Sequence, residues 1–183
     1  GAGFDLFQDT GASGADTIVA TADGATIGLQ SGFGAASGIE AISSDGFANV
    51  SITAGSGNDT LDFSAVLLTG ITKIDGGLGN DTLIGSSGGD TLSGSTGNDT
   101  IFGAGEFNVY SYTDGANVIY GDDGNDNLFG DGGSDDLRGN DGNDLLCGQG
   151  SDDTLYGNDG NDKMDAGAGT DTNRGGDGHD MCR

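Results

Sequence analysis

Residues 121–156 read GDDGNDNLF, GDGGSDDLR, GNDGNDLLC and GQGSDDTLY, which are four consecutive nonapeptides of one pattern. Each nonapeptide begins with Gly, has Asp at position six and has Leu at position eight. Self-similarity at a short fixed period is typical of a solenoid, in which each repeat stacks on the next. The stretch therefore predicts a repetitive fold in place of a conventional globular core.

The same period covers the second part of the chain, from Gly76 to Arg183. The sequence divides there into twelve nonapeptides in constant phase, of which the units at 103–111 and 112–120 have lost most of the pattern. Position eight is apolar in most units, and it is the one inward position of a three-residue strand. Position six is Asn108 and Asn117 in the two decayed units and an acid in the others, namely Asp81, Asp90, Asp99, Asp126, Asp135, Asp144, Asp153, Asp162, Asp171 and Asp180.

The composition indicates that something besides apolar burial must stabilise this chain. Its 183 residues include 40 Gly and no Pro, and 30 acids against five bases give a formal net charge of −25. Few large apolar residues and a high net charge are typical of a disordered chain. Either the chain is disordered, or a bound cation supplies the missing stabilisation.

Several classes of function are disfavoured by the same composition. Five basic residues provide no basic surface for nucleic acid or an anionic membrane, and no apolar run approaches the ~20 residues of a membrane span. His179, the only His, lies in the last unit, so we expect no catalytic triad and no enzyme activity. Cys147, Cys182 and His179 lack zinc spacing, and the two Cys lie two coils apart, too far for a disulfide. The chain begins at Gly1 without an apolar leader, which we interpret as a piece of a longer protein.

The twelve units resemble the calcium-binding nonapeptide of the RTX (repeats in toxin) proteins. The resemblance implies a right-handed parallel β-roll, in which each nonapeptide forms a turn followed by a short strand, and two nonapeptides complete one coil. It also implies that a calcium ion lies between two turns stacked one coil apart. Glycine turns ending in Asp supply the carbonyl and carboxylate oxygens that calcium prefers. The implied metal ligands are the ten acids at position six, Asp59, and the turn glycines Gly76, Gly77, Gly94, Gly121, Gly130, Gly139, Gly148, Gly157 and Gly175.

A coil of two nonapeptides sorts the units onto two edges of the roll. One edge would carry Asp81, Asp99, Asn117, Asp135, Asp153 and Asp171, and the other Asp90, Asn108, Asp126, Asp144, Asp162 and Asp180. Six pairs then have two acids, 81/99, 135/153, 153/171, 126/144, 144/162 and 162/180, so we expect about six or more Ca²⁺ ions. Pairs that include Asn108 or Asn117 should be weak or empty, and Asp59 with Asp81 is a candidate seventh pair. A merely solvated acidic face would need neither the glycine spacing nor the phase. The position-three row Asp123, Asp141, Asp159 and Asp177 either extends these sites or forms a bare acidic ridge.

The segment that precedes Gly76 is less regular. GASGADTIV at 11–19 and AGSGNDTLD at 54–62 are recognisable units, separated by β-branched runs. We expect wider, irregular β-solenoid coils over 1–75 that precede the twelve-unit β-roll of 76–183. A separate small β domain is the alternative.

We expect a non-catalytic calcium-binding module of a larger secreted protein. The resemblance implies type I secretion, folding on extracellular calcium, and neighbouring domains of the same protein as partners, and we expect a monomer. The alternative is an adhesin or polysaccharide-binding spacer attached to an enzyme or surface protein. Phe107, Tyr110, Tyr112 and Tyr120 would then bind a glycan, although such aromatics more often fill a turn that has lost its ion. An ice-binding surface is disfavoured because position three lacks a regular Thr or Asn lattice.

Overall fold

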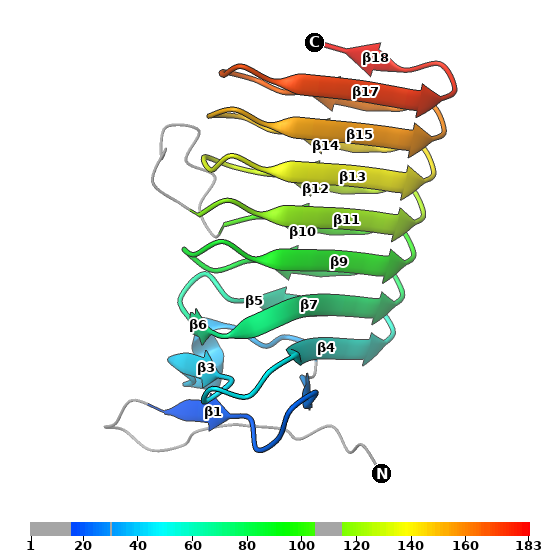
Figure 1. Cartoon of the computed structure of the whole chain (residues 1–183). Helices are drawn as coiled ribbons and strands as arrows, with labels where there is room; N and C mark the ends of the chain where they lie inside the picture. The colour runs from blue at the N-terminus through cyan, green and yellow to red at the C-terminus, as the bar shows by residue number, and fades with distance from the viewer. Residues whose placement is uncertain (1–15, 30, 105–114) are drawn as a thin grey trace.

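The computed structural model describes residues 16–29, 31–104 and 115–183, and it is a parallel β-solenoid whose coils stack along one axis (Figure 1). All paired strands of the described residues are parallel. The larger sheet consists, in spatial order, of β17 (Thr172–Asp177), β15 (Thr154–Asp159), β13 (Asp136–Asp141), β11 (Val118–Asp123), β9 (Thr91–Thr96), β7 (Ile71–Leu78), β4 (Val50–Ser56) and β2 (Thr26–Gly28). The smaller sheet consists of β18 (Met181–Cys182), β16 (Lys163–Asp165), β14 (Leu145–Cys147), β12 (Asn127–Phe129), β10 (Thr100–Phe102), β8 (Thr82–Ile84) and β5 (Thr60–Asp62). The predicted parallel β-roll is confirmed.

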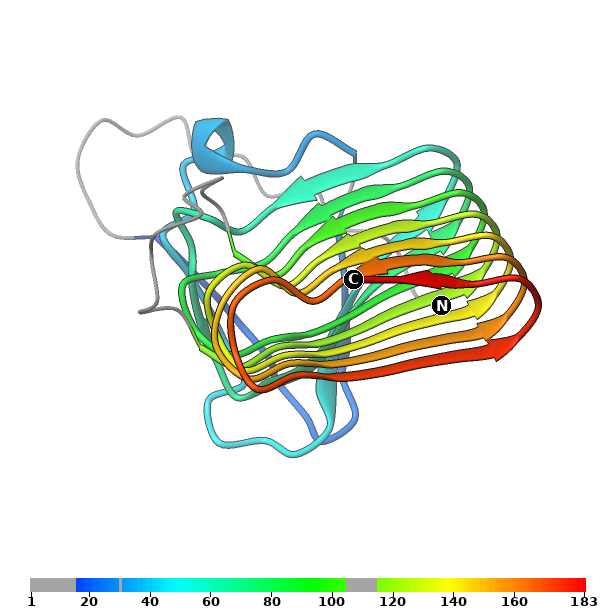
Figure 2. The ribbon, with the colours of Figure 1, turned by 90° about the horizontal axis from the view of Figure 1, so that it is seen from above.

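The roll is a flattened tube with a thin core. Figure 2 shows the two sheets facing each other, with turns joining them at both edges. Most three-residue strands of the smaller sheet bury only their middle side chain. The position-eight residues that are fully buried, at 0 % exposure, are Leu83, Leu92, Ile101, Ile119, Leu128, Leu137, Leu146 and Leu155. Each of these strands thus contributes one apolar residue to the core at position eight, as the nonapeptide period predicts.

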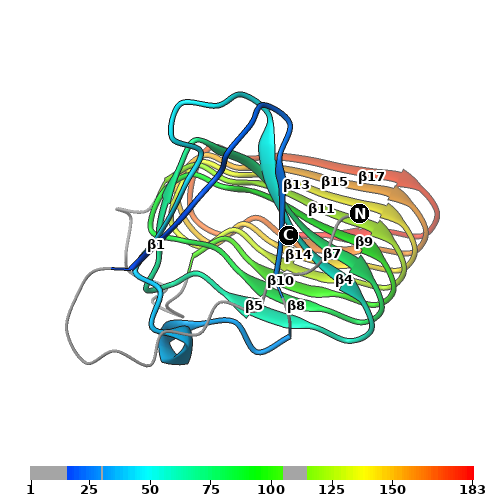
Figure 3. The ribbon, with the colours of Figure 1, turned by 90° about the horizontal axis from the view of Figure 1, so that it is seen from below.

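The N-terminal coils are wider, as expected. They add a third sheet of β1 (Thr17–Val19), β3 (Ala41–Ser43) and β6 (Leu67–Thr69), and a short 3₁₀ helix, Ala35–Ser37. Seen from below in Figure 3, the chain that follows β1 crosses the N-terminal end of the roll. The rings of Phe33 and Phe63 lie 5.4 Å apart in this wider core. One cluster of buried apolar residues extends from Ile18 to Ala166, so these coils share their core with the roll.

The register departs from two nonapeptides per coil at one place within the repeats. Leu92 pairs with Ile119, and Ile101 pairs with Leu128, so both pairs are separated by three nonapeptides. Our expectation that the units at 103–111 and 112–120 both form half-coils is therefore wrong. The next strand after β10 is β11, and Asn108, Phe107, Tyr110 and Tyr112, which lie between them in the chain, are outside the described residues. An insertion of one whole nonapeptide leaves the period unchanged, which is why the sequence did not reveal it.

Candidate metal sites at the two edges of the roll

The position-six residues form one row along each edge, held by the backbone. Each backbone N–H donates a hydrogen bond to the side-chain Oδ1 of the position-six residue one coil further on. On the first edge the row is Asp59, Asp81, Asp99, Asp126, Asp144, Asp162 and Asp180. On the second edge it is Asp90, Asn117, Asp135, Asp153 and Asp171. The turns therefore stack with their position-six side chains in line.

These rows correct the expected assignment of the edges. Asp99 is followed by Asp126, three nonapeptides away, and not by Asn117. Asp90 is followed by Asn117, also three nonapeptides away, and not by Asn108. The expected neighbours 81/99, 126/144, 144/162, 162/180, 135/153 and 153/171 do lie side by side. The first edge thus gains the pair 99/126, which has two acids, and its row of acids is uninterrupted.

Five carboxylates of the first edge are buried with one oxygen unsatisfied. Asp81, Asp99, Asp126, Asp144 and Asp162 are at most 2 % exposed, and the Oδ2 atom of each accepts no hydrogen bond. A buried carboxylate oxygen without a partner is costly, so it demands a cation or a proton. Burial accordingly raises the pKa of Asp126 to about 7 and the pKa values of Asp99 and Asp144 to about 6. The accepted backbone N–H bonds lower these pKa values only in part.

The glycine at position one leaves a space beside each of these oxygens. A Cβ added to Gly121 would collide with Asp126 Oδ2 and lie 2.7 Å from the carbonyl oxygen of Gly139, one coil further on. A Cβ on Gly76 would lie 2.5 Å from Asp81 Oδ2 and 2.9 Å from the Gly94 carbonyl oxygen. The same arrangement recurs at Gly94, Gly139 and Gly157. A carboxylate oxygen and a carbonyl oxygen thus lie close together beside each of these glycines, and both are ligand types that calcium prefers.

The turn backbone requires positive φ at two other positions. At position two, Asp122, Asn140 and Asn158 have φ of 74°, 76° and 75°, which Asn and Asp tolerate better than most residues. At position four of the first edge, Gly124 and Gly142 have φ of 146° and 144°, a conformation essentially confined to glycine. The glycines at positions one and four therefore have different roles.

The first turns of the second edge are satisfied by protein groups. Asp90 Oδ2 accepts hydrogen bonds from Ser86 N (2.7 Å) and Ser86 Oγ (2.9 Å). Asn117 donates from Nδ2 to the Gly130 carbonyl oxygen at 3.4 Å. Further along this edge, Asp135 and Asp153 are buried acids in the same row, beside Gly130 and Gly148. The turns of Asp90 and Asn117 thus differ in their chemistry from the turns of the first edge.

The remaining predicted residues occupy the ends and the outside of the rows. Asp59 is partly buried and donates its backbone N–H to Asp81 Oδ1 at 2.8 Å. Asp171 and Asp180 lie in the last coil and are partly exposed, and Gly77 and Gly175 precede Asp81 and Asp180 in their turns. The position-three row is exposed and in register, with Asp123 paired with Asp141.

Sequence reasoning missed two sets of side-chain contacts that the stacking of the coils creates. The exposed Asn98, Asn125, Asn143 and Asn161 form a chain of hydrogen bonds beside the first edge. On the outer face of the larger sheet, Arg138 lies over the rings of Tyr120 (5.5 Å) and Tyr156 (5.3 Å). The recurrence of Asn at position five could have revealed the first set. The second depended on knowing which coils are neighbours.

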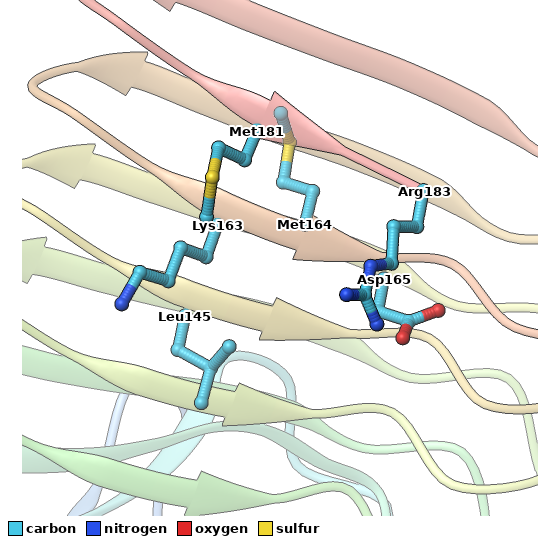
Figure 4. A pocket seen from close by; sticks show the side chains of 6 residues that line it. All are labelled: Leu145, Lys163, Met164, Asp165, Met181 and Arg183. Atoms are coloured by element: carbon cyan, nitrogen blue, oxygen red, sulfur yellow. The ribbon is translucent and has the colours of Figure 1, made fainter.

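Other chemistry is sparse in the described part of the chain. No group of three or more His, Cys, Asp or Glu side chains that could hold a metal was found there, so sites at the edges would depend on carbonyl oxygens as well. A hollow at the C-terminal end is lined by Leu145, Lys163, Met164, Asp165, Met181 and Arg183 (Figure 4). Asp165 supplies the one carboxylate side chain of its lining. Cys147 and Cys182 are free thiols.

No helix of the described residues is long and apolar enough to cross a membrane.

Stacked parallel coils with buried acids in oxygen-lined turns define a metal-binding β-roll. The family model of the RTX calcium-binding nonapeptide repeat matches four segments, 44–65, 74–109, 111–146 and 148–182, which together make up more than half of the chain. The chain belongs to this family, whose repeats bind calcium, are typically structural, and typically occur in secreted proteins. No curated protein and no solved structure matches the chain.

Proposed function

We propose that this chain is a non-catalytic folding module of a larger secreted protein, ordered by calcium when it reaches the extracellular medium. The observation that carries the proposal is the row of five buried Oδ2 atoms on the first edge, which accept no hydrogen bond. Calcium would be held there by carboxylate oxygens of the Asp row and carbonyl oxygens of the position-one glycines. The ion would supply positive charge to a chain of net charge −25 and order its glycine-rich turns.

The expected affinity for calcium is of the right size to make folding depend on extracellular calcium. Extracellular calcium modules bind at about 10⁻⁴ to 10⁻³ M. At roughly 2 mM free calcium, a site with a Kd of ~10⁻⁴ M stabilises the folded state by about 1.8 kcal/mol. At submicromolar calcium the same site contributes almost nothing, while the repulsion between the buried carboxylates remains. The module would therefore stay unfolded inside a cell and fold outside it.

The test is circular dichroism of the chain in calcium, after chelation, and after calcium is restored. We expect the β signal to be lost on chelation and to return with calcium. An unchanged spectrum in excess chelator would contradict the proposal.

A matched pair of variants locates the effect at the first edge. Asp126→Asn neutralises a buried carboxylate of the row, whereas Asp123→Asn removes the same charge from the exposed position-three ridge. At roughly 2 mM calcium we expect Asp126→Asn to bind fewer ions and to lose about 2 kcal/mol of stability. Asp123→Asn should keep the wild-type ion number, measured by equilibrium dialysis, and nearly the wild-type stability. Equal losses in the two variants would mean that only the total charge matters.

The second candidate function, glycan binding by an adhesin or spacer, is not favoured by the described residues. Of the proposed aromatic platform, only Tyr120 is described, and its ring is covered on one side by the Arg138 guanidinium at 5.5 Å. Binding of the calcium-loaded chain to a glycan array would reverse this preference.

A further inference from the structure

Asn117 occupies the place of an acid on the second edge, and its side chain both accepts and donates a hydrogen bond within the protein. Asn117 is 1 % exposed. Its Oδ1 accepts the backbone N–H of Asp90 at 2.9 Å, and its Nδ2 donates to the Gly130 carbonyl oxygen at 3.4 Å. The first bond fixes the amide orientation, because a flipped amide would place two donors face to face. Nδ2 therefore points into the space between the turns.

That space is the counterpart of the oxygen-lined points on the first edge. A Cβ added to Gly103 would lie 2.5 Å from Asn117 Nδ2 and 2.6 Å from the Gly130 carbonyl oxygen. On the first edge an anionic oxygen converges with the carbonyl oxygen, whereas an N–H donor does so here. The donor satisfies the carbonyl oxygen and presents positive partial charge to an approaching cation.

The preceding turn of the same edge is closed in a similar way. Asp90 Oδ2 accepts two hydrogen bonds from Ser86, a residue that is 5 % exposed. Its counterpart at position two of a first-edge turn, Ser95, bonds instead to Asp75 at 2.8 Å and leaves Asp99 Oδ2 without a donor. The carboxylate of Asp90 therefore has its partners within its own turn.

We infer that Ser86, Asp90 and Asn117 form a clasp that closes two successive turns of the second edge without calcium. The clasp lies beside the strands whose register changes from two to three nonapeptides, and its protein hydrogen bonds take the place of an ion there. Calcium then binds along the whole first edge, and on the second edge only beyond Asn117. This inference rests on the proposed calcium binding and specifies which turns take part in it.

The experiment is the number of calcium ions bound per chain, measured by equilibrium dialysis on the wild type and three variants. Asn117→Asp replaces the donor by a carboxylate oxygen, and we expect one additional ion per chain. Ser134→Asp, the control, adds the same charge to an exposed position of the same edge and should leave the ion number unchanged. Asp90→Asn removes a carboxylate that already has protein partners and should also keep the wild-type number.

The outcomes separate this inference from the proposed function. Failure of the wild type to bind calcium would contradict the proposed function itself. Calcium binding by the wild type with no gain in Asn117→Asp, or an equal gain in Ser134→Asp, would overturn the clasp. Loss of an ion in Asp90→Asn would overturn it as well, and this variant decides the matter if Asn117→Asp fails to fold.

Discussion

Glycines that look alike in the repeat have different tasks at the residue scale. At position one, a Cβ would fill the space between a carboxylate oxygen and a carbonyl oxygen, as at Gly121. At position four of the first edge the backbone itself excludes other residues, because Gly142 has φ of 144° and a Cβ there would collide with the Gly124 carbonyl oxygen. The first glycine serves the site, and the second serves the stacking of the turns.

Gly142→Ala should therefore destabilise the roll by more than about 2 kcal/mol, because a strained φ adds to a clash between backbones. The control is Gly88→Ala, since Gly88 has no positive φ and a Cβ there would make an ordinary 3.6 Å contact with Ser86 Oγ. Chemical denaturation in saturating calcium measures both. Similar midpoints for the two variants would show that the turns are not held by this conformation.

At the scale of the element, the strands of the repeats place one apolar residue in the core at position eight, and Asn173 takes that position in β17. Asn173 pairs with Leu155 in the register of β15 and β17. Its Nδ2 donates to the Arg183 carbonyl oxygen at 3.1 Å, but its Oδ1 is buried and accepts no hydrogen bond. The last coil therefore lacks the apolar contact that secures the others.

Asn173→Leu should stabilise the last coil by roughly 1–2 kcal/mol, because it replaces an unsatisfied oxygen by apolar contact with Leu155. Thr172→Leu is the control, since it adds the same side chain at the neighbouring, exposed position. Hydrogen exchange of the β17 amides in calcium would report the change. A slower exchange in both variants would indicate a general effect of β propensity.

At the scale of the whole molecule, the row of buried acids links folding to pH. In the calcium-free fold, burial raises the pKa of Asp126 to about 7 and the pKa values of Asp99 and Asp144 to about 6, against an ordinary value of 3.8. Between about pH 4 and pH 7 the folded state thus binds more protons than the unfolded state. Stability of the calcium-free fold must then fall as pH rises through this window.

We therefore expect the calcium-free chain to recover β structure when pH is lowered from 7.5 to 4.5. Circular dichroism in calcium-depleted buffer measures this, with sedimentation to show that the chain stays monomeric. In the presence of calcium the dependence reverses, because protons compete for the same oxygens and calcium affinity should fall toward pH 5. A calcium-free chain that is less ordered at pH 4.5 than at pH 7.5 would contradict the assignment of the buried row.

The nonapeptide period determined much of this molecule by itself. Because position eight recurs in every unit, Leu128 and Leu137 had to face one core, and because position six recurs, Asp126 and Asp144 had to stack. The oxygen-rich composition of the turns likewise predicted the class of ligand. These features depend only on the phase of the repeat, which the sequence displays directly.

Which coils are neighbours was decided only by the tertiary structure. An inserted nonapeptide leaves the phase unchanged, so the sequence paired Asp99 with Asn117, whereas the fold pairs it with Asp126. The hydrogen bonds between Ser86 and Asp90, and the contact between Arg138 and Tyr156, also depend on turn geometry and register. Local pattern fixed which side chains face inward, and the stacking of coils fixed which of them meet, because an inserted nonapeptide changes which turns are neighbours without changing the phase of the repeat.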